Sequence, residues 1–385
     1  MAQRKKVGII FSNNENWIGG TYYILNLISA LNTLEDVEKP EIVVFTRSIS
    51  PIDNSEIENI AYPYISYNKL IDGYYDYPFI KSFINKISIR LFKRILFDER
   101  PVNIDICFPN PNHYHFEKLS QKYKVSWIPD FQEDYLPVFF SKEEVLIRKE
   151  YQRELSNTSK PVIFSSHNAL MDFKRLYPNY KNTIFVLQFA VTHLSYKSLD
   201  IGHLREKHKL LGDYFFAPNQ FWAHKNHIVV LKAIKKLKDE GKEFLVAFSG
   251  KQEDYRNPDY FASLQKYVVE NNLQENIRFL GFIDRKEQLQ LMNNALAVIQ
   301  PSLFEGWSTV VEDAKAMNAH LICSDLGVHR EQLNKNVDFF NPHSYQDLAE
   351  KLLKNIENKT QIENMDYSLN IKKFGKDFME IVNKL

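Results

Sequence analysis

Short apolar runs rich in β-branched and aromatic residues alternate along this chain with longer stretches of helical period. Such alternation is typical of parallel βαβ construction, in which a helix follows each strand. In the first half, the runs that we expect to form strands are Val7–Phe11, Ile42–Phe45, Ile104–Phe108, Val125–Ile128, Val162–Phe164 and Ile184–Phe189. In the second half, they are Tyr214–Ala217, Phe244–Phe248, Ile277–Ile283, Leu296–Ile299, His320–Cys323 and Val337–Phe340. Apolar spacing between the later runs predicts amphipathic helices at Asn226–Glu240, Pro258–Asn271, Asp284–Asn294 and Ser308–Asn318.

The alternation stops between Ala190 and Asp213 and then restarts, which indicates a domain boundary. A chain of 385 residues is also too long for one compact core. We therefore predict an α/β fold with two Rossmann-like, doubly wound parallel-sheet domains, residues 1–200 and 201–360. Residues 361–385 show a helical pattern after the last strand is complete, and we expect this C-terminal helix to cross back toward the N-terminal domain.

Composition narrows the class of protein. The 49 basic and 48 acidic residues nearly cancel, so the chain as a whole lacks the charge of a nucleic-acid binder. Its two cysteines, Cys107 and Cys323, lie in apolar runs, which argues against a disulfide framework or a cysteine zinc site and favours a reducing compartment. The first apolar run is too short for a secretory signal, and no segment approaches the ~18 apolar residues of a membrane span. We expect a cytoplasmic protein.

The strongest candidate for chemistry is a loop between a buried strand and an amphipathic helix. Glu305 places a carboxylate on this loop, and Gly306 permits close approach of the backbone. The amides that follow, at the helix N-terminus, belong to Trp307, Ser308 and Thr309. Peptide dipoles at that position favour an anion such as a diphosphate, and Asp313 lies about a turn further along. The simpler interpretation is that both acids complement the helix dipole.

Two further loops follow the first strand of each half and open a helix. In the second half, Asn219 and Gln220 precede Lys225, whose side chain can reach a phosphate. In the first half, the pair Gly19-Gly20 lets backbone amides approach a phosphate, and Thr21 comes next. An exposed helix-start lysine and an ordinary glycine turn are the alternatives.

Polar residues also follow two strands of the first half. Asp130 comes after Val125–Ile128, and His167 comes after Val162–Phe164. The carboxyl ends of strands face the ligand cleft in open α/β sheets, so both side chains are candidates for the site. A turn or cap role for Asp130 is the alternative.

Together these motifs resemble glycosyltransferase family 4, whose signature is a glutamate, seven residues and a second glutamate, with an EGFG-like loop after the first. In this chain the spacing runs from Glu305 to Asp313, so an aspartate stands second. The arginine and lysine with which the family clamps the donor diphosphate match Gln220 and Lys225. Pro129 stands where many members have the histidine of a His-Asp pair.

The resemblance implies the GT-B architecture, with an acceptor-binding N-terminal domain and a nucleotide-sugar-binding C-terminal domain facing a central cleft. It implies that Glu305, Lys225 and Asp130 are catalytic and that the loop with Thr21 lies on the acceptor side. From its place after a strand, His167 is another candidate for the acceptor side. The donor-binding residues that it implies are Gly19, Gly20, Asn219, Gln220, Lys225, Phe282, Glu305, Gly306, Trp307, Ser308, Thr309 and Asp313. In the family the first carboxylate contacts the donor sugar, the second holds the ribose, and the base is bound near Phe282.

The activity that the resemblance implies is retaining transfer of a hexosyl group from a nucleotide sugar to a hydroxyl of a glycan or lipid-linked glycan. Lys225 and the loop amides can stabilise the departing diphosphate, and the chain has no Asp-x-Asp triplet, so we predict no metal and no cofactor. By analogy with bacterial relatives we expect a part in surface polysaccharide synthesis. The alternatives are a nucleotide-sugar epimerase or hydrolase and a non-catalytic nucleotide-sugar-binding protein.

One segment, residues 81–97, suggests a further surface. Its basic residues Lys86, Arg90, Lys93 and Arg94 fall broadly on one side at helical spacing, with large apolar residues on the other. Such a helix suits peripheral contact with anionic lipid on the cytoplasmic membrane face. A helix packed on its own domain with a solvated basic face is the alternative.

Overall fold

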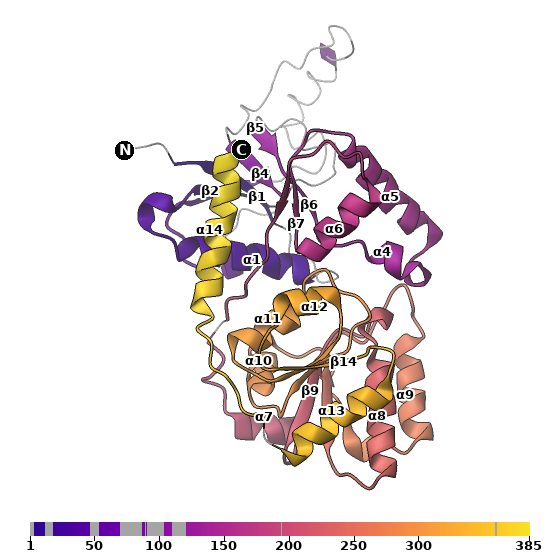
Figure 1. Cartoon of the computed structure of the whole chain (residues 1–385). Helices are drawn as coiled ribbons and strands as arrows, with labels where there is room; N and C mark the ends of the chain where they lie inside the picture. Colours follow the sequence, from indigo (N-terminus) through magenta and orange to yellow (C-terminus); the bar gives the residue numbers. More distant parts are fainter. Residues whose placement is uncertain are drawn as a thin grey trace.

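The structure is a computed structural model in which two α/β halves are stacked along the long axis of the molecule (Figure 1). It describes residues 4–11, 18–46, 54–69, 87–88, 90, 104–109, 121–193, 195–358 and 360–385. Most of the basic segment 81–97 lies outside these residues, as do Lys86, Lys93 and Arg94. Among the described helices, none combines the length and the apolar character needed to cross a membrane.

The first half contains two parallel sheets. A five-stranded sheet has the order β3-β2-β1-β4-β5, and a three-stranded sheet has the order β6-β7-β8. The strands are β1 (Lys6–Ile10), β2 (Glu41–Thr46), β3 (Ile65–Lys69), β4 (Ile104–Phe108), β5 (Gln121–Lys124), β6 (Ser126–Ile128), β7 (Val162–Phe164) and β8 (Ile184–Val186). The helices are α1 (Ile18–Asn32), α2 (Ser55–Glu58), α4 (Gln132–Tyr135), α5 (Lys142–Ser156) and α6 (His167–Leu176), with the 3₁₀ turns η2 (Asp36–Glu38) and η4 (Pro137–Phe139).

The second half contains one six-stranded parallel sheet of order β11-β10-β9-β12-β13-β14. Its strands are β9 (Tyr214–Pro218), β10 (Leu245–Ser249), β11 (Ile277–Phe279), β12 (Val298–Gln300), β13 (Leu321–Ser324) and β14 (Val337–Phe340). Its helices are α7 (Ile201–Lys207), α8 (His227–Asp239), α9 (Tyr260–Glu270), α10 (Arg285–Asn293), α11 (Thr309–Ala316), α12 (Gly327–Gln332) and α13 (Tyr345–Glu357), with the turns η5 (Ala223–Lys225) and η6 (Gln274–Asn276). The predicted α/β class with parallel sheets is confirmed.

The strand predictions failed at the sheet edges and at two loops. Strands β3 and β5 were not predicted because they lie at the two edges of their sheet, where a strand need not be a continuous apolar run. The predicted strand Ile184–Phe189 was too long, since β8 ends at Val186. The predicted strand Ile277–Ile283 was also too long, since β11 ends at Phe279 and Gly281 then turns with a φ of +71°.

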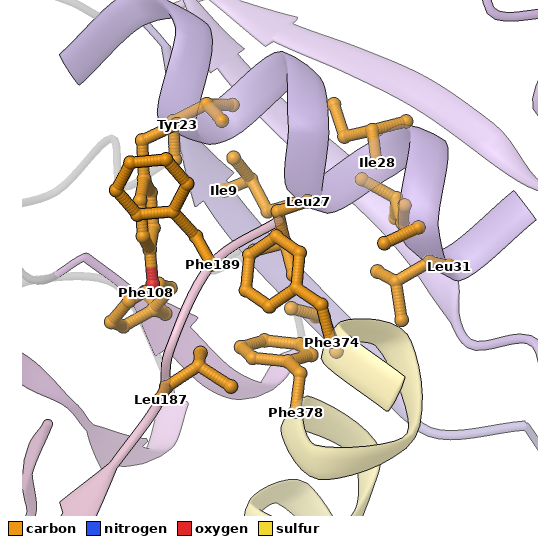
Figure 2. Close-up of a cluster of buried hydrophobic side chains, with 14 of the residues drawn as sticks. Ile9, Tyr23, Leu27, Ile28, Leu31, Phe108, Leu187, Phe189, Phe374 and Phe378 are labelled. Atoms are coloured by element: carbon orange, nitrogen blue, oxygen red, sulfur yellow. The ribbon is translucent and has the colours of Figure 1, made fainter. Parts of the chain in front are cut away.

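The C-terminal helix α14 (Ser368–Lys384) lies against α1 of the first half (Figure 1). Figure 2 shows its Phe374 and Phe378 in the cluster that also contains Leu27 and Leu31 of α1, all of them buried. The backbones approach so closely that a Cβ at Gly375 would lie 2.6 Å from the carbonyl oxygen of Ala30. This packing fixes the last segment of the chain on the first half.

The segment before α14 also fixes the halves relative to each other. Tyr367 is buried, and its hydroxyl donates to Glu312 of α11 and accepts from the Val191 N–H at 3.0 Å. Trp307, in the loop before α11, donates through Nε1 to the carbonyl oxygen of Phe189 at 3.0 Å. The loop between β12 and α11 is therefore held at a defined position against the first half.

Candidate functional site

A cavity of about 620 Å³ lies between the two halves. Its second-half wall consists of loops that follow β9, β10, β11 and β12, at the carboxyl ends of the parallel strands. Its first-half wall comes from α1, the region of α2, and the segment after β6 that includes Asp130. Ligands bind at this end of open parallel sheets, so the cavity is the candidate site.

Glu305 lies in this cleft, and one of its carboxylate oxygens accepts three hydrogen bonds. Its Oε1 accepts from Lys225 Nζ at 2.6 Å, from Ser302 Oγ at 2.6 Å and from Gln300 Nε2 at 2.8 Å. Within the described part of the chain no hydrogen bond reaches Oε2. One carboxylate oxygen is thus anchored by the protein, and the other has no hydrogen-bond partner among the described residues.

The surroundings keep Glu305 ionised. Burial alone would raise the pKa of its carboxyl, but positive charge nearby, chiefly that of Lys225, and the hydrogen bond from Lys225 lower the pKa below its usual value. His224 is itself buried, and burial lowers the pKa of its imidazole to about 3, so it is neutral. Lys225 is therefore the cationic partner of Glu305.

Helix α11 begins next to Glu305, but one of its first amides is already occupied. Ser308 caps the helix by accepting from the Val311 N–H at 3.4 Å. Its own N–H donates to Gln332 Oε1 at 3.0 Å, so the prediction that the Ser308 amide is free for an anion was wrong. Thr309 lines the cleft and begins the helix, and the amides of a first helical turn have no partner within the helix.

Gly306 brings this loop into contact with the first half. A Cβ at this position would lie 2.6 Å from the Pro129 carbonyl oxygen and 2.8 Å from the Asp130 Cβ. Asp130 is itself held, because its Oδ1 accepts from the Gln132 N–H at 3.0 Å. The absence of a side chain at Gly306 is what allows Glu305 and Asp130 to line the same cleft.

Asp130 differs electrostatically from Glu305. Burial raises the pKa of its carboxyl to about 6, and the nearby charges of Glu133 and Glu305 act in the same direction. No lysine or arginine pairs with it among the described residues. The cleft therefore holds one carboxylate with a lowered pKa and one carboxyl that binds a proton close to neutral pH.

Asp313 lies a turn into α11 and is engaged by two groups that the sequence did not predict. Its Oδ1 lies 2.6 Å from Arg285 Nη2 and 3.1 Å from His193 Nε2. Arg285 could have been suspected, because it begins a predicted helix after a strand. His193 comes from the connection between the halves, which has no periodic pattern to indicate its position.

The remaining predicted residues divide into two groups. Those that line the cleft, besides the residues above, are Gly19, Asn219, Gln220, Phe282 and Trp307. Those described residues that do not line it are Gly20, Thr21 and His167. Gly20 and Thr21 are buried in the first turn of α1, because that helix begins two residues earlier, at Ile18.

His167 lies at the N-terminus of α6 and is not among the residues that line the cavity, although Ser165 is. Its backbone N–H donates to Glu331 Oε1 at 2.7 Å, and the Asn168 N–H donates to Glu331 Oε2 at 3.0 Å. Glu331 of the second half thus occupies the N-terminus of α6. The sequence had suggested that this position, after a strand, was a candidate for ligand binding. The same Glu331 accepts from Gln188 Nε2 at 2.6 Å.

The sequence of the second half is similar to one known family. Residues 204–374 match the family described as "Glycosyl transferases group 1". O-antigen chain mannosyltransferase RfbU of Salmonella typhimurium is 29% identical over 170 residues, which is 44% of this chain and 44% of that protein. Protein CapJ of Staphylococcus aureus is 31% identical over 144 residues, or 37% of this chain and 33% of that protein. The matches thus span less than half of either relative.

Solved structures resemble the whole chain. Anabaena Alr3699/HepE in complex with UDP has a TM-score of 0.64 at 14% identity, with 99% of this chain and 100% of that chain covered. WaaG, a glycosyltransferase involved in lipopolysaccharide biosynthesis, has a TM-score of 0.59 at 12% identity, with 98% of each chain covered. At these identities the likeness is one of fold, and it confirms the predicted GT-B architecture of two Rossmann-like domains.

Proposed function

We propose, from the premise that residues 204–374 form a group 1 glycosyltransferase domain, that this chain is a glycosyltransferase that uses a nucleotide-sugar donor. The acceptor in this proposal is a hydroxyl of a glycan or lipid-linked glycan, and the reaction retains the anomeric configuration without a metal. The observation that carries the proposal is Glu305, which lines the cleft between two Rossmann-like domains and is anchored through Oε1 to Lys225, Ser302 and Gln300.

The cleft offers what transfer from an activated donor requires. The donor already has a good leaving group, so the protein must orient the sugar and stabilise the departing diphosphate. In the proposed arrangement Glu305 orients the sugar hydroxyls, while Lys225 and the first turn of α11 face the diphosphate. The acceptor oxygen bonds to the anomeric carbon on the face that the diphosphate leaves. The acceptor proton passes to an oxygen of that leaving phosphate.

The biological setting is part of the proposal. RfbU is named as an O-antigen chain mannosyltransferase, and its similarity supports a part for this chain in surface polysaccharide synthesis. Nucleotide sugars are the proposed substrates, so we place the protein in the cytoplasm. Peripheral membrane contact through residues 81–97 stays a prediction, because that segment lies mostly outside the described residues.

The test is a panel of UDP-, GDP-, dTDP- and ADP-sugars in the presence of a chelator, read first as thermal shift and then as transfer to glycan acceptors. A ligand that binds the folded state stabilises it, by about 2.7 kcal/mol at a hundred times its Kd. We expect a thermal shift with the nucleotide sugars of one base only. We also expect the sugar to leave the donor only when an acceptor is present. Donor consumption at full rate without acceptor would instead indicate an epimerase or hydrolase, and absence of any shift would contradict the proposal.

Gly306→Ala should reduce kcat/KM of transfer by about 10-fold to 100-fold, because misplacement of a reacting group by 1 Å can cost that much. The new methyl group would lie 2.6 Å from the Pro129 carbonyl oxygen. This clash can be relieved only if the loop with Glu305 or the first-half segment with Pro129 moves. Steady-state kinetics with saturating acceptor measure the effect. Wild-type kinetics in this variant would show that the contact with the first half is not needed for transfer.

A further inference from the structure

We propose that Arg285, held in place by Asp313, is the residue that contacts the ribose-phosphate part of the donor nucleotide, and that Asp313 itself is a positioning residue. This inference rests on the proposed function, since it assigns a role within the same cleft. It departs from the family pattern, in which the second acidic residue of the signature holds the ribose.

Asp313 lies at the wall of the cleft, but its carboxylate is almost fully buried. Its side chain is 1% exposed, against 16% for Arg285 and 13% for His193. Both neighbours lie on Oδ1, and Oδ2 is buried without a hydrogen-bond partner. Arg285 and His193 therefore already occupy one oxygen of this carboxylate, and the residue itself has little exposed surface to offer a ligand.

Arg285, in contrast, has N–H groups to offer. Nη2 donates to Asp313 at 2.6 Å, whereas Nη1 lies 3.5 Å from Gln288 Oε1, at the limit of a hydrogen bond. Asp284 caps α10 by accepting from the Lys286 N–H, which fixes the backbone from which Arg285 extends. The guanidinium carbon also lies 5.2 Å from the ring centroid of Tyr22, on α1 across the cleft. The guanidinium is therefore oriented from both sides of the cleft.

The charges of the cleft support the same assignment. Burial would lower the pKa of Arg285, but the Asp313 carboxylate outweighs burial and raises it, so the guanidinium stays charged. Among the described residues that line the cleft, the lysine and arginine side chains are those of Lys225 and Arg285. Gln220 stands where the family resemblance places an arginine. Arg285 thus supplies a guanidinium from a different loop, which suits the acceptor oxygens of ribose and phosphate.

The experiment is a double-mutant cycle on nucleotide affinity. UDP, GDP, dTDP and ADP are titrated by calorimetry, in chelator, into the wild type, Arg285→Gln, Asp313→Asn and the double variant. For the nucleotide that binds the wild type, we expect Arg285→Gln to weaken affinity by roughly 10-fold to 100-fold. Asp313→Asn should weaken it less, and the double variant should be no weaker than Arg285→Gln alone.

The order of these effects decides the assignment. If Asp313→Asn causes the larger loss and the double variant equals it, Asp313 contacts the nucleotide and the inference is wrong. If Arg285→Gln binds like the wild type, the inference is also wrong. Should Arg285→Gln not fold, Arg285→Lys keeps the charge without the planar fork, and we still expect at least a several-fold loss.

Two controls separate this inference from the function on which it rests. Lys286→Gln removes a charge from the adjacent, exposed position of α10, which does not line the cleft, and should leave affinity unchanged. A wild type that binds none of the four nucleotides would defeat the proposed function itself. Weakened binding in a Lys225 variant together with unchanged binding in Arg285→Gln would defeat the present inference alone.

Discussion

Glu305→Gln should lower kcat/KM of sugar transfer by about 100-fold to 1,000-fold, the range seen when one preorganised polar group at a reacting centre is removed. The amide keeps the size of the side chain and leaves the cleft filled. It removes the negative charge to which Lys225, Ser302 and Gln300 donate hydrogen bonds, and it replaces one acceptor oxygen with a donor group. The sugar hydroxyls would then lose their charged acceptor at the reacting centre.

Nucleotide binding separates this role from a general loss of structure. A free nucleoside diphosphate has no donor sugar, so its affinity for Glu305→Gln should stay within about threefold of the wild type. Glu357→Gln is a matched control, because Glu357 is an exposed carboxylate that pairs with Lys242 on the surface. If Glu305→Gln transferred sugar from the preferred donor at the wild-type rate, Glu305 would have no role in the mechanism.

Local patterns predicted the scaffold of this site well. The helices predicted in the second half contain α8, α9, α10 and α11, and predicted strands precede the loops that line the cleft. A buried parallel strand has to be a continuous apolar run, and an amphipathic helix has to repeat every three to four residues, so both are visible in one sequence. Edge strands such as β3 escape this test because they are partly solvated.

Contacts between distant parts of the chain could not be predicted in the same way. His193 and Asp313 are 120 residues apart in the sequence. Glu331 accepts a hydrogen bond from the backbone amide of His167, which is 164 residues away. No periodicity relates such positions, since the relative placement of the two halves brings them together. Gln300 and Ser302 are a different case. They lie five and three residues before Glu305, close enough for their donors to have been considered.

Lys225→Met should weaken the affinity for a nucleoside diphosphate by roughly 10-fold to 100-fold, as expected for loss of a charge-assisted hydrogen bond in a largely buried place. Methionine retains the length of the lysine stem, so packing around η5 changes little. Calorimetric titration of the preferred nucleotide measures the loss. Unchanged affinity would mean that Lys225 serves Glu305 and does not face the diphosphate.

The same variant should also change the pH dependence of transfer, because Lys225 makes the largest contribution to lowering the pKa of Glu305. Without that charge, burial is opposed less, and the pKa of the Glu305 carboxyl rises. The ionised form that orients the sugar is then lost at a higher pH than in the wild type. The acidic limb of the kcat/KM profile of Lys225→Met should therefore move to higher pH. An acidic limb that coincides with that of the wild type would show that Glu305 does not limit transfer in its protonated form.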